Sequence, residues 1–191
     1  MRVGVFALQG DVREHLRTLN SMGIEAIEVR NTTELASVDG LILPGGESTT
    51  ISKLIDIFSL RKALTDFINS GKPVFGTCAG MILLAKEVLD AASGQRSLEA
   101  MDISVRRNAF GSQLDSFETE VEFDGKAAKV AFIRAPIVER LGEGVEVLSK
   151  LPNGSIVAVR SGNLLATAFH PELTEDNSVH EYFVTMVSKS L

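Results

Sequence analysis

The chain has 191 residues, of which 45% are hydrophobic and 23% are charged. This composition is typical of one globular domain and excludes a disordered or low-complexity protein. A formal net charge of −6 gives no basic surface for nucleic acid or an anionic membrane, and no apolar run approaches the roughly 20 residues of a membrane span. A single cysteine excludes an internal disulfide and suits the reducing cytoplasm, where we expect the protein.

The first half of the chain alternates apolar runs with helical spacings. The apolar runs predict strands at residues 3–8, 24–29, 41–43 and 74–75. The helical spacings predict helices at residues 12–19, 51–58, 60–68 and 81–88. Apolar strands separated by amphipathic helices indicate a parallel sheet that is covered by helices on both faces.

The second half, after a polar connector at residues 90–98, is richer in strand patterns. These patterns predict strands at residues 103–107, 116–123, 129–133, 145–148, 156–159 and 164–169, with a helix at the end of the chain. Asn153-Gly154 is a strong hairpin signal. We therefore expect one three-layer α/β domain over residues 1–191, with a mostly parallel sheet extended by antiparallel strands.

The cysteine lies where a predicted strand turns into a predicted helix. Cys78 is flanked by Gly76 and Gly80, which is the cysteine form of the G-x-S-x-G nucleophile turn. Such a turn places the thiol at the carboxyl edge of the sheet and at a helix N-terminus, whose dipole favours the thiolate. A lone buried cysteine is more often structural, but the two glycines favour a nucleophile.

A nucleophilic cysteine needs a base, and the chain has three histidines. We expect His15 and His180 to be surface or packing residues of helices. His170 ends a predicted strand, and in an extended segment Glu172 points to the same side as His170. The sequence predicts a triad of Cys78, His170 and Glu172, in which the carboxylate orients the imidazole. The alternative for His170 is a strand-end turn beside a solvated glutamate.

Acyl transfer also needs hydrogen-bond donors for an oxyanion. Residues 44–49, with the sequence P-G-G-E-S-T, follow a predicted strand at the same sheet edge as the nucleophile. We expect the N–H groups of Gly46 and Ala79 to form this pair, because glycine lets the backbone approach a substrate closely. The alternative, which is compatible with the first, is a plain loop in which Ser48 or Thr49 caps the next helix.

Residue types that bind metals are scarce. One cysteine and three scattered histidines, with no H-x-x-x-H or C-x-x-C pair, predict neither a metal site nor a cofactor. The lysine-bearing spacing of a phosphate loop is also missing.

Sequence blocks between residues 7 and 174 resemble a known family. The G-T-C-A-G and H-P-E motifs resemble the class I (triad) glutamine amidotransferases. Further blocks resemble the glutaminase subunits of pyridoxal 5′-phosphate synthases within that class, namely A-L-Q-G, L-P-G-G-E-S-T-T, R-N-A-F-G, F-I-R-A-P and F-H-P-E-L-T. The catalytic motifs indicate only the superfamily, whereas G-G-E-S-T together with R-N-x-F-G indicates this subunit.

The resemblance implies hydrolysis of the side-chain amide of L-glutamine, with ammonia passed to a (β/α)₈-barrel synthase subunit in a hetero-oligomer. It implies that Cys78 carries a glutamyl thioester, that His170 shuttles protons and that Glu172 orients His170. It places Gln9 at the partner-facing end of the site. The residues that it implies for the glutamine pocket are Gly46, Glu47, Ser48, Arg107, Ile133 and Arg134.

The chain departs from the family pattern at two places. Ser112 stands where arginine is usual, and Glu99-Ala100 stand where glycine and leucine are common. We expect both departures to affect contacts at the pocket rim or the partner surface, because neither touches the triad. Two other functions stay open, a glutaminase serving another synthesis such as that of histidine, and a non-catalytic regulatory module. The G-G-E-S-T block disfavours the former and the complete triad the latter.

Overall fold

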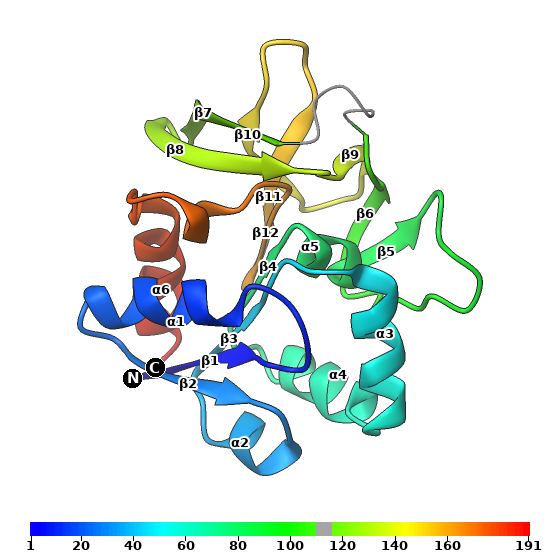
Figure 1. Ribbon diagram of the computed structural model, residues 1–191, viewed down its shortest axis with the longest axis vertical. Coiled ribbons are helices and arrows are strands. Elements are labelled where there is room, and N and C mark those ends of the chain that lie inside the picture. The colour runs from blue at the N-terminus through cyan, green and yellow to red at the C-terminus, as the bar shows by residue number, and fades with distance from the viewer. Residues whose placement is uncertain (110–115) are drawn as a thin grey trace.

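The computed structural model describes residues 1–109 and 116–191, in which strands and helices alternate before a strand-rich second half (Figure 1). The strands are β1 (Arg2–Phe6), β2 (Glu25–Val29), β3 (Gly40–Leu43), β4 (Val74–Thr77), β5 (Ala85–Val88), β6 (Met101–Arg106), β7 (Ser116–Phe123), β8 (Lys126–Ile133), β9 (Ile137–Leu141), β10 (Glu146–Lys150), β11 (Ile156–Ser161) and β12 (Leu164–Thr167). The helices are α1 (Val12–Ser21), α2 (Thr32–Ala36), α3 (Ser48–Ile57), α4 (Arg61–Asn69), α5 (Ala79–Leu84), the 3₁₀ turn η1 (Pro171–Leu173) and α6 (Ser178–Ser190).

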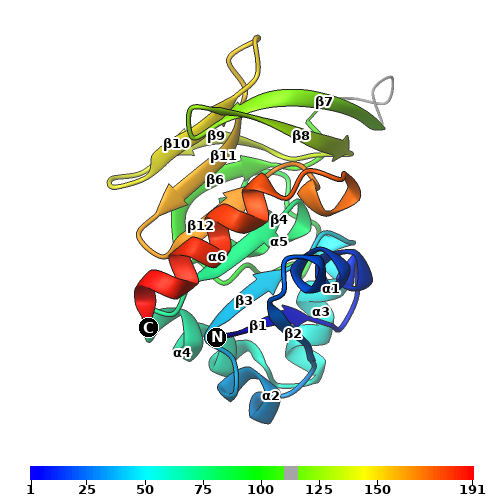
Figure 2. The same ribbon diagram turned by 90° about the vertical axis from the view of Figure 1, so that its left-hand side faces the viewer.

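The main sheet has the strand order β2-β1-β3-β4-β12-β11-β9-β6-β5, with β10 paired to β11. Strands β2, β1, β3, β4 and β12 are parallel, whereas β11, β9 and β10 join by antiparallel pairing. Helices α1 and α6 cover one face, and α3, α4 and α5 cover the other (Figures 1 and 2). This arrangement confirms the predicted three-layer α/β class and its antiparallel extension.

Burial explains why the central strands are continuous apolar runs. Strands β3, β4 and β12 are buried along their whole length, because helices lie on both sides of them. The predicted hairpin is also confirmed, since β10 and β11 pair across the turn that contains Asn153-Gly154. Among the described residues, no helix has the length and apolar character needed to cross a membrane.

Three details of the sequence prediction are wrong. The helix expected at residues 81–88 ends at Leu84, because Ala85 is extended and pairs in parallel with Met101 of β6. The strand expected at residues 164–169 ends at Thr167. Strands β7 and β8 do not extend the main sheet but form a separate two-stranded sheet. The short elements α2 and β9 were not predicted, since each has only five residues.

The parallel strands bring four chain segments to one edge of the sheet. The segments that follow β1, β3, β4 and β12 all begin at carboxyl ends, which is where open α/β sheets bind ligands. The candidate site is built from these four segments and from the end of β8.

Candidate active site

Cys78 occupies a strained turn between β4 and α5. Its φ of +47° and ψ of −100° are costly for a residue with a side chain, and such strain concentrates at functional sites. A Cβ on Gly76 would lie 2.5 Å from the carbonyl carbon of Gly80, and one on Gly80 would collide with the carbonyl oxygen of Leu43. The turn therefore requires both glycines, as the G-x-C-x-G motif predicts. The sulfur of Cys78 lies 3.9 Å from the carbonyl oxygen of Ile133.

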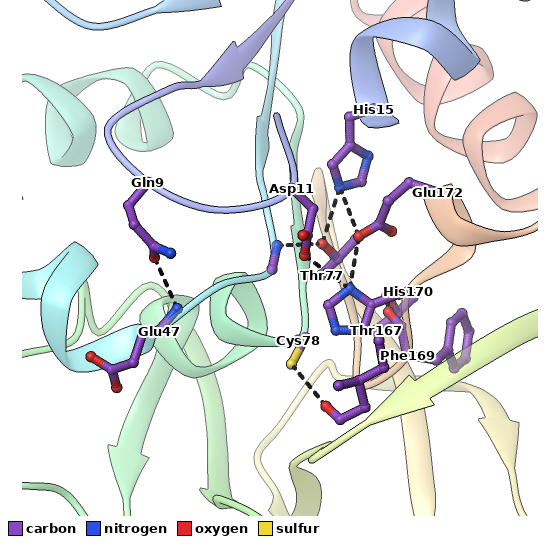
Figure 3. Close-up of polar contacts among 12 residues, drawn as sticks. Gln9, Asp11, His15, Glu47, Thr77, Cys78, Thr167, Phe169, His170 and Glu172 are labelled. Atoms are coloured by element: carbon purple, nitrogen blue, oxygen red, sulfur yellow. Dashed lines mark hydrogen bonds and ion pairs between the residues drawn. The ribbon is translucent and has the colours of Figure 1, made fainter. Parts of the chain in front are cut away.

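His170 and Glu172 meet just beyond the end of β12. The Nδ1 atom of His170 lies 2.8 Å from Oε1 of Glu172, and both side chains are buried (Figure 3). The backbone N–H of His170 donates to the carbonyl oxygen of Ala131 on β8, which holds the main chain of His170 against that strand. The local geometry differs from the extended segment we expected, because Glu172 lies in the 3₁₀ turn η1.

A second carboxylate, that of Asp11, contacts the same imidazole nitrogen, and we did not predict it from the sequence. The Oδ2 atom of Asp11 is 3.3 Å from Nδ1 of His170 (Figure 3). The segment before α1 that carries Asp11 lies against the glycine loop, because the N–H of Asp11 donates to the carbonyl oxygen of Gly45 at 3.0 Å. No local motif marks Asp11, since the contact depends on how β1 and β12 sit in the sheet.

The carboxylates decide the charge of His170. Burial alone lowers the pKa of His170, but hydrogen bonds with Asp11, Cys78 and Glu172 outweigh it and raise that pKa to about 12. Burial also raises the pKa of Glu172, and its Oε2 atom has no hydrogen-bond partner among the described residues. At neutral pH the imidazole therefore holds a proton beside the sulfur of Cys78 and can deliver it to a leaving group.

A pair of buried histidines lies behind Glu172. His15 Nδ1 is 2.9 Å from His180 Nε2, and His15 Nε2 is 3.2 Å from Oγ1 of Thr77 and 3.5 Å from Oε1 of Glu172. Burial lowers the pKa of His180 to about 4 and the pKa of His15 well below its usual range. Both rings are therefore neutral packing residues, and the alternative expectation of a surface position is wrong.

The glycine loop after β3 lies against the segment after β1. A Cβ on Gly46 would lie 2.6 Å from Oε1 of Gln9, and Gly46 has a φ of +153° that favours glycine. The Oε1 atom of Gln9 accepts the N–H of Glu47 at 2.9 Å (Figure 3). Ala79 is the first residue of α5, so its N–H has no acceptor within that helix.

The cap of α3 is Glu47, whereas we expected Ser48 or Thr49. The Glu47 carboxylate accepts the N–H groups of Thr49 at 3.1 Å and Thr50 at 2.7 Å. Burial alone raises the pKa of Glu47, but hydrogen bonds from Thr50 and Thr49 outweigh it and lower that pKa. The loop therefore presents an ionised carboxylate beside the site.

Gln95, which we did not single out from the sequence, joins two of the predicted pocket residues. Its Nε2 atom donates to Oγ of Ser48 at 2.9 Å, and its Oε1 atom accepts Nη1 of Arg107 at 2.7 Å. The N–H of Ala92 donates to the same Oε1 atom at 3.2 Å. The polar connector between β5 and β6 thus links the start of α3 with Arg107.

The remaining predicted pocket residues, Ile133 and Arg134, lie at the end of β8 and directly after it. Ile133 ends β8 beside the thiol, whereas Arg134 is exposed. Glu99 has a φ of +53°, a conformation that suits the glycine common at this position of the family better than glutamate. Ser112 lies outside the described residues.

One group of side chains in the described ranges has the composition of a metal site. One ligand atom each from Asp11, His170 and Glu172 lie within 4.8 Å of one another. The same atoms already share the proton on Nδ1 of His170, so a metal ion would have to compete with that proton.

The assembled groups are those that an amide-cleaving acyl transfer needs. A cysteine at a strained turn, a charged imidazole, carboxylates that hold the imidazole and a glycine loop lie at one sheet edge. The neighbouring segments carry the polar side chains of Gln9, Glu47, Ser48 and Arg107.

Comparisons with known proteins agree with this chemistry. The model of the SNO glutamine amidotransferase family matches residues 5–189. A pyridoxal 5′-phosphate synthase subunit PdxT from Dehalococcoides mccartyi is 57% identical over 189 residues, which cover 97% of each chain. The PdxT subunit from Corynebacterium jeikeium is 54% identical over 191 residues, covering 99% of this chain and 98% of that one. A crystal structure described as a glutamine amidotransferase has a TM-score of 0.92 at 48% identity, covering 97% of this chain and 98% of that one. The chain belongs to the SNO glutamine amidotransferase family.

Proposed function

We propose that this chain is the glutaminase subunit of a pyridoxal 5′-phosphate synthase. It hydrolyses the side-chain amide of L-glutamine to L-glutamate and ammonia, and delivers the ammonia to a synthase subunit. Family membership and the names of the PdxT relatives support this function. The observation that carries it is the contact of the His170 imidazole with two carboxylates beside a cysteine in a strained turn.

The reaction uses Cys78 as nucleophile and His170 as the proton carrier. The Cys78 thiolate attacks the amide carbon, and the N–H groups of Gly46 and Ala79 bind the oxyanion that forms. The His170 imidazolium gives its proton to the amide nitrogen, the carbon–nitrogen bond breaks and ammonia leaves a glutamyl thioester. His170 then takes a proton from water, which attacks the thioester and releases glutamate and the thiolate. Glu172 orients the imidazole throughout.

Charged groups at the rim recognise the substrate as an amino acid. The guanidinium of Arg107 is suited to the α-carboxylate of glutamine, and the ionised carboxylate of Glu47 to its α-ammonium group. Ser48 follows Glu47 in the chain and is held by Gln95, which also holds Arg107. Ile133 and Arg134 close the pocket from the β8 side.

The partner is a (β/α)₈-barrel synthase subunit, and the two chains form a hetero-oligomer in the cytoplasm. Residues 1–191 act as one glutaminase domain. Gln9 and the glycine loop face the partner, and the hydrogen bond from Glu47 to Gln9 couples docking to the oxyanion donor Gly46. Because one peptide rotation moves that N–H, isolated chains have weak glutaminase activity that rises when the barrel subunit binds.

A reconstitution with Cys78→Ala tests this function. The wild-type complex should release ammonia from glutamine and make pyridoxal 5′-phosphate, measured by a coupled glutamate assay and by absorbance. The Cys78→Ala complex should do neither with glutamine, because the covalent path is lost. It should still make the product from added ammonium chloride, which controls for folding and docking. Ammonia release by the Cys78→Ala complex, or its absence in the wild-type complex, would contradict the proposal.

A further inference from the structure

Asp11 stands at a helix cap but does not cap the helix. It is the residue directly before α1, a position where aspartate commonly accepts an N–H of the first turn. Its side chain makes no such hydrogen bond, and instead Oδ2 lies 3.3 Å from Nδ1 of His170. A carboxylate that stabilises only the helix would point to the helix N–H groups. The side chain therefore serves the imidazole.

The backbone around Asp11 is built for this contact. Its N–H is bound by the carbonyl oxygen of Gly45, so the segment cannot shift without moving the glycine loop. A Cβ on Gly45 would lie 2.8 Å from Oδ2 of Asp11 and would collide with the imidazole of His170. The missing side chain at Gly45 thus leaves the space in which the carboxylate and the imidazole meet.

We propose that Asp11 is a positioning residue that holds the Nδ1 proton of His170 together with Glu172 and so keeps the imidazole charged beside Cys78. The inference rests on the proposed function, which makes His170 the proton carrier. The two carboxylates differ in setting, because Glu172 is fully buried whereas the Asp11 side chain is 36% exposed. Asp11 is therefore the member of the pair that water, substrate or a docked partner can reach.

Of the titratable groups that face His170, only the two carboxylates can stabilise its positive charge as neighbouring anions through Nδ1. Cys78 comes from the turn after β4, Glu172 from η1, and His15 from α1. His15 is neutral because burial lowers its pKa, so it adds no charge that could replace Asp11. Hydrogen bonds with Asp11, Cys78 and Glu172 raise the pKa of His170 against the effect of burial, in agreement with the geometry.

The test measures the thiolate of Cys78 directly and needs no glutamine. Cys78 is the single cysteine of the chain, so the rate of alkylation by iodoacetamide reports it alone. In Asp11→Asn the imidazolium of His170 loses the charge of one of its two carboxylate partners, so the charged imidazole that supports attack by the sulfur is less stable. We expect the alkylation rate at pH 7 to fall about three- to tenfold, which is the effect expected from the loss of one partly exposed ion-pair partner. At pH 10, where free cysteine thiols in general are ionised, the two rates should agree.

Two further variants separate this role from a structural one. Glu14→Gln removes the same charge from the first turn of α1 and should leave both rates unchanged. Asp11→Ala should reproduce the loss seen with Asp11→Asn, with a thermal midpoint within a few degrees of wild type because no cap is lost. Equal alkylation rates at pH 7 for Asp11→Asn and wild type would overturn the proposal. An equal fall of the alkylation rate at pH 10 would show that Asp11 has a structural role, and would also overturn the proposal. A normal alkylation profile without ammonia release in the wild-type complex would overturn the proposed function alone.

Discussion

The buried histidines on the two sides of Glu172 differ in charge, because His170 is protonated whereas His15 and His180 are neutral. On one side His170 contacts Glu172 and Asp11, and its pKa is raised to about 12. On the other side the pair of His15 and His180 is fully buried and neutral, with the pKa of His180 lowered to about 4.

The difference between them is the distance to a carboxylate rather than the degree of burial. Glu172 Oε1 is 2.8 Å from Nδ1 of His170 but 3.5 Å from Nε2 of His15, and Asp11 reaches only His170. A buried imidazole stays neutral unless a close anion repays the lost hydration of its charged form. The same residue type thus supplies a proton carrier on one side and a rigid support on the other.

The largest effect is expected when the charged imidazole, His170, is removed. His170→Ala should lower kcat for glutamine hydrolysis by about 10²–10⁴-fold, because it removes the group that carries the proton. Glu172→Gln should lose less, since the ring remains and only its orientation suffers. Steady-state ammonia release by the reconstituted complex measures both. The double variant of His170→Ala and Cys78→Ala should be little worse than either single variant, because the residues act as a unit. Additive losses, or wild-type activity in Glu172→Gln, would contradict the triad.

The pH dependence of unfolding should differ between the neutral His180 and the charged His170. The pKa of folded His180 is lowered to about 4, so the unfolded state binds more protons between about pH 4 and pH 6.5. The free energy of unfolding should therefore fall as the pH falls through this window, by up to about 3 kcal/mol from this residue. Urea unfolding of His180→Gln should show a flatter dependence there.

The charged histidine should give the opposite sign. The pKa of folded His170 is raised, so its contribution to stability is complete below about pH 6.5 and is lost as the pH rises toward 12. Urea unfolding of His170→Gln between pH 6.5 and pH 9 should show a smaller decline than the wild type. The idea fails if both variants change the pH dependence in the same direction.

The smallest expected effect lies outside both histidine groups. Gln95→Leu removes the hydrogen bonds to Ser48 and Arg107 and should raise KM for glutamine about three- to tenfold with little change in kcat, as the loss of about one hydrogen bond predicts. Gln95→Glu keeps an acceptor for Arg107 and should recover most of the affinity. A fall in kcat at constant KM would place Gln95 in the chemistry instead.

The parts of the site that depend on local backbone geometry were predictable from the sequence. Two glycines around Cys78 specify the turn, and the structure has no room for a Cβ at either. The short spacing between His170 and Glu172 limited their separation whatever the local conformation, so they meet although η1 is not extended.

Contacts between distant segments were not predictable in the same way. Asp11, His15 and Gln95 carry no local motif, and their partners follow from strand order and loop packing. The strongly apolar strands β3 and β4 were predicted from the sequence. The helix predicted at residues 81–88 was too long, because the structure has a helix only to Leu84 and a strand from Ala85. Leu84 and Val88 satisfy the spacing of a helix as well as that of a helix followed by a strand, and the pairing of β5 with β6 decides between them.

The backbone contacts at the glycines determine where directed evolution can act on this enzyme. Gly45, Gly76 and Gly80 each face other atoms at distances that leave no space for a methyl group, so libraries randomised there should return only the parent residue. Gln95 and Arg107 meet through side chains that have alternative rotamers, and substitutions there leave the backbone frame intact. New amide specificity should therefore be sought at the connector and the end of β6, with the nucleophile turn kept constant.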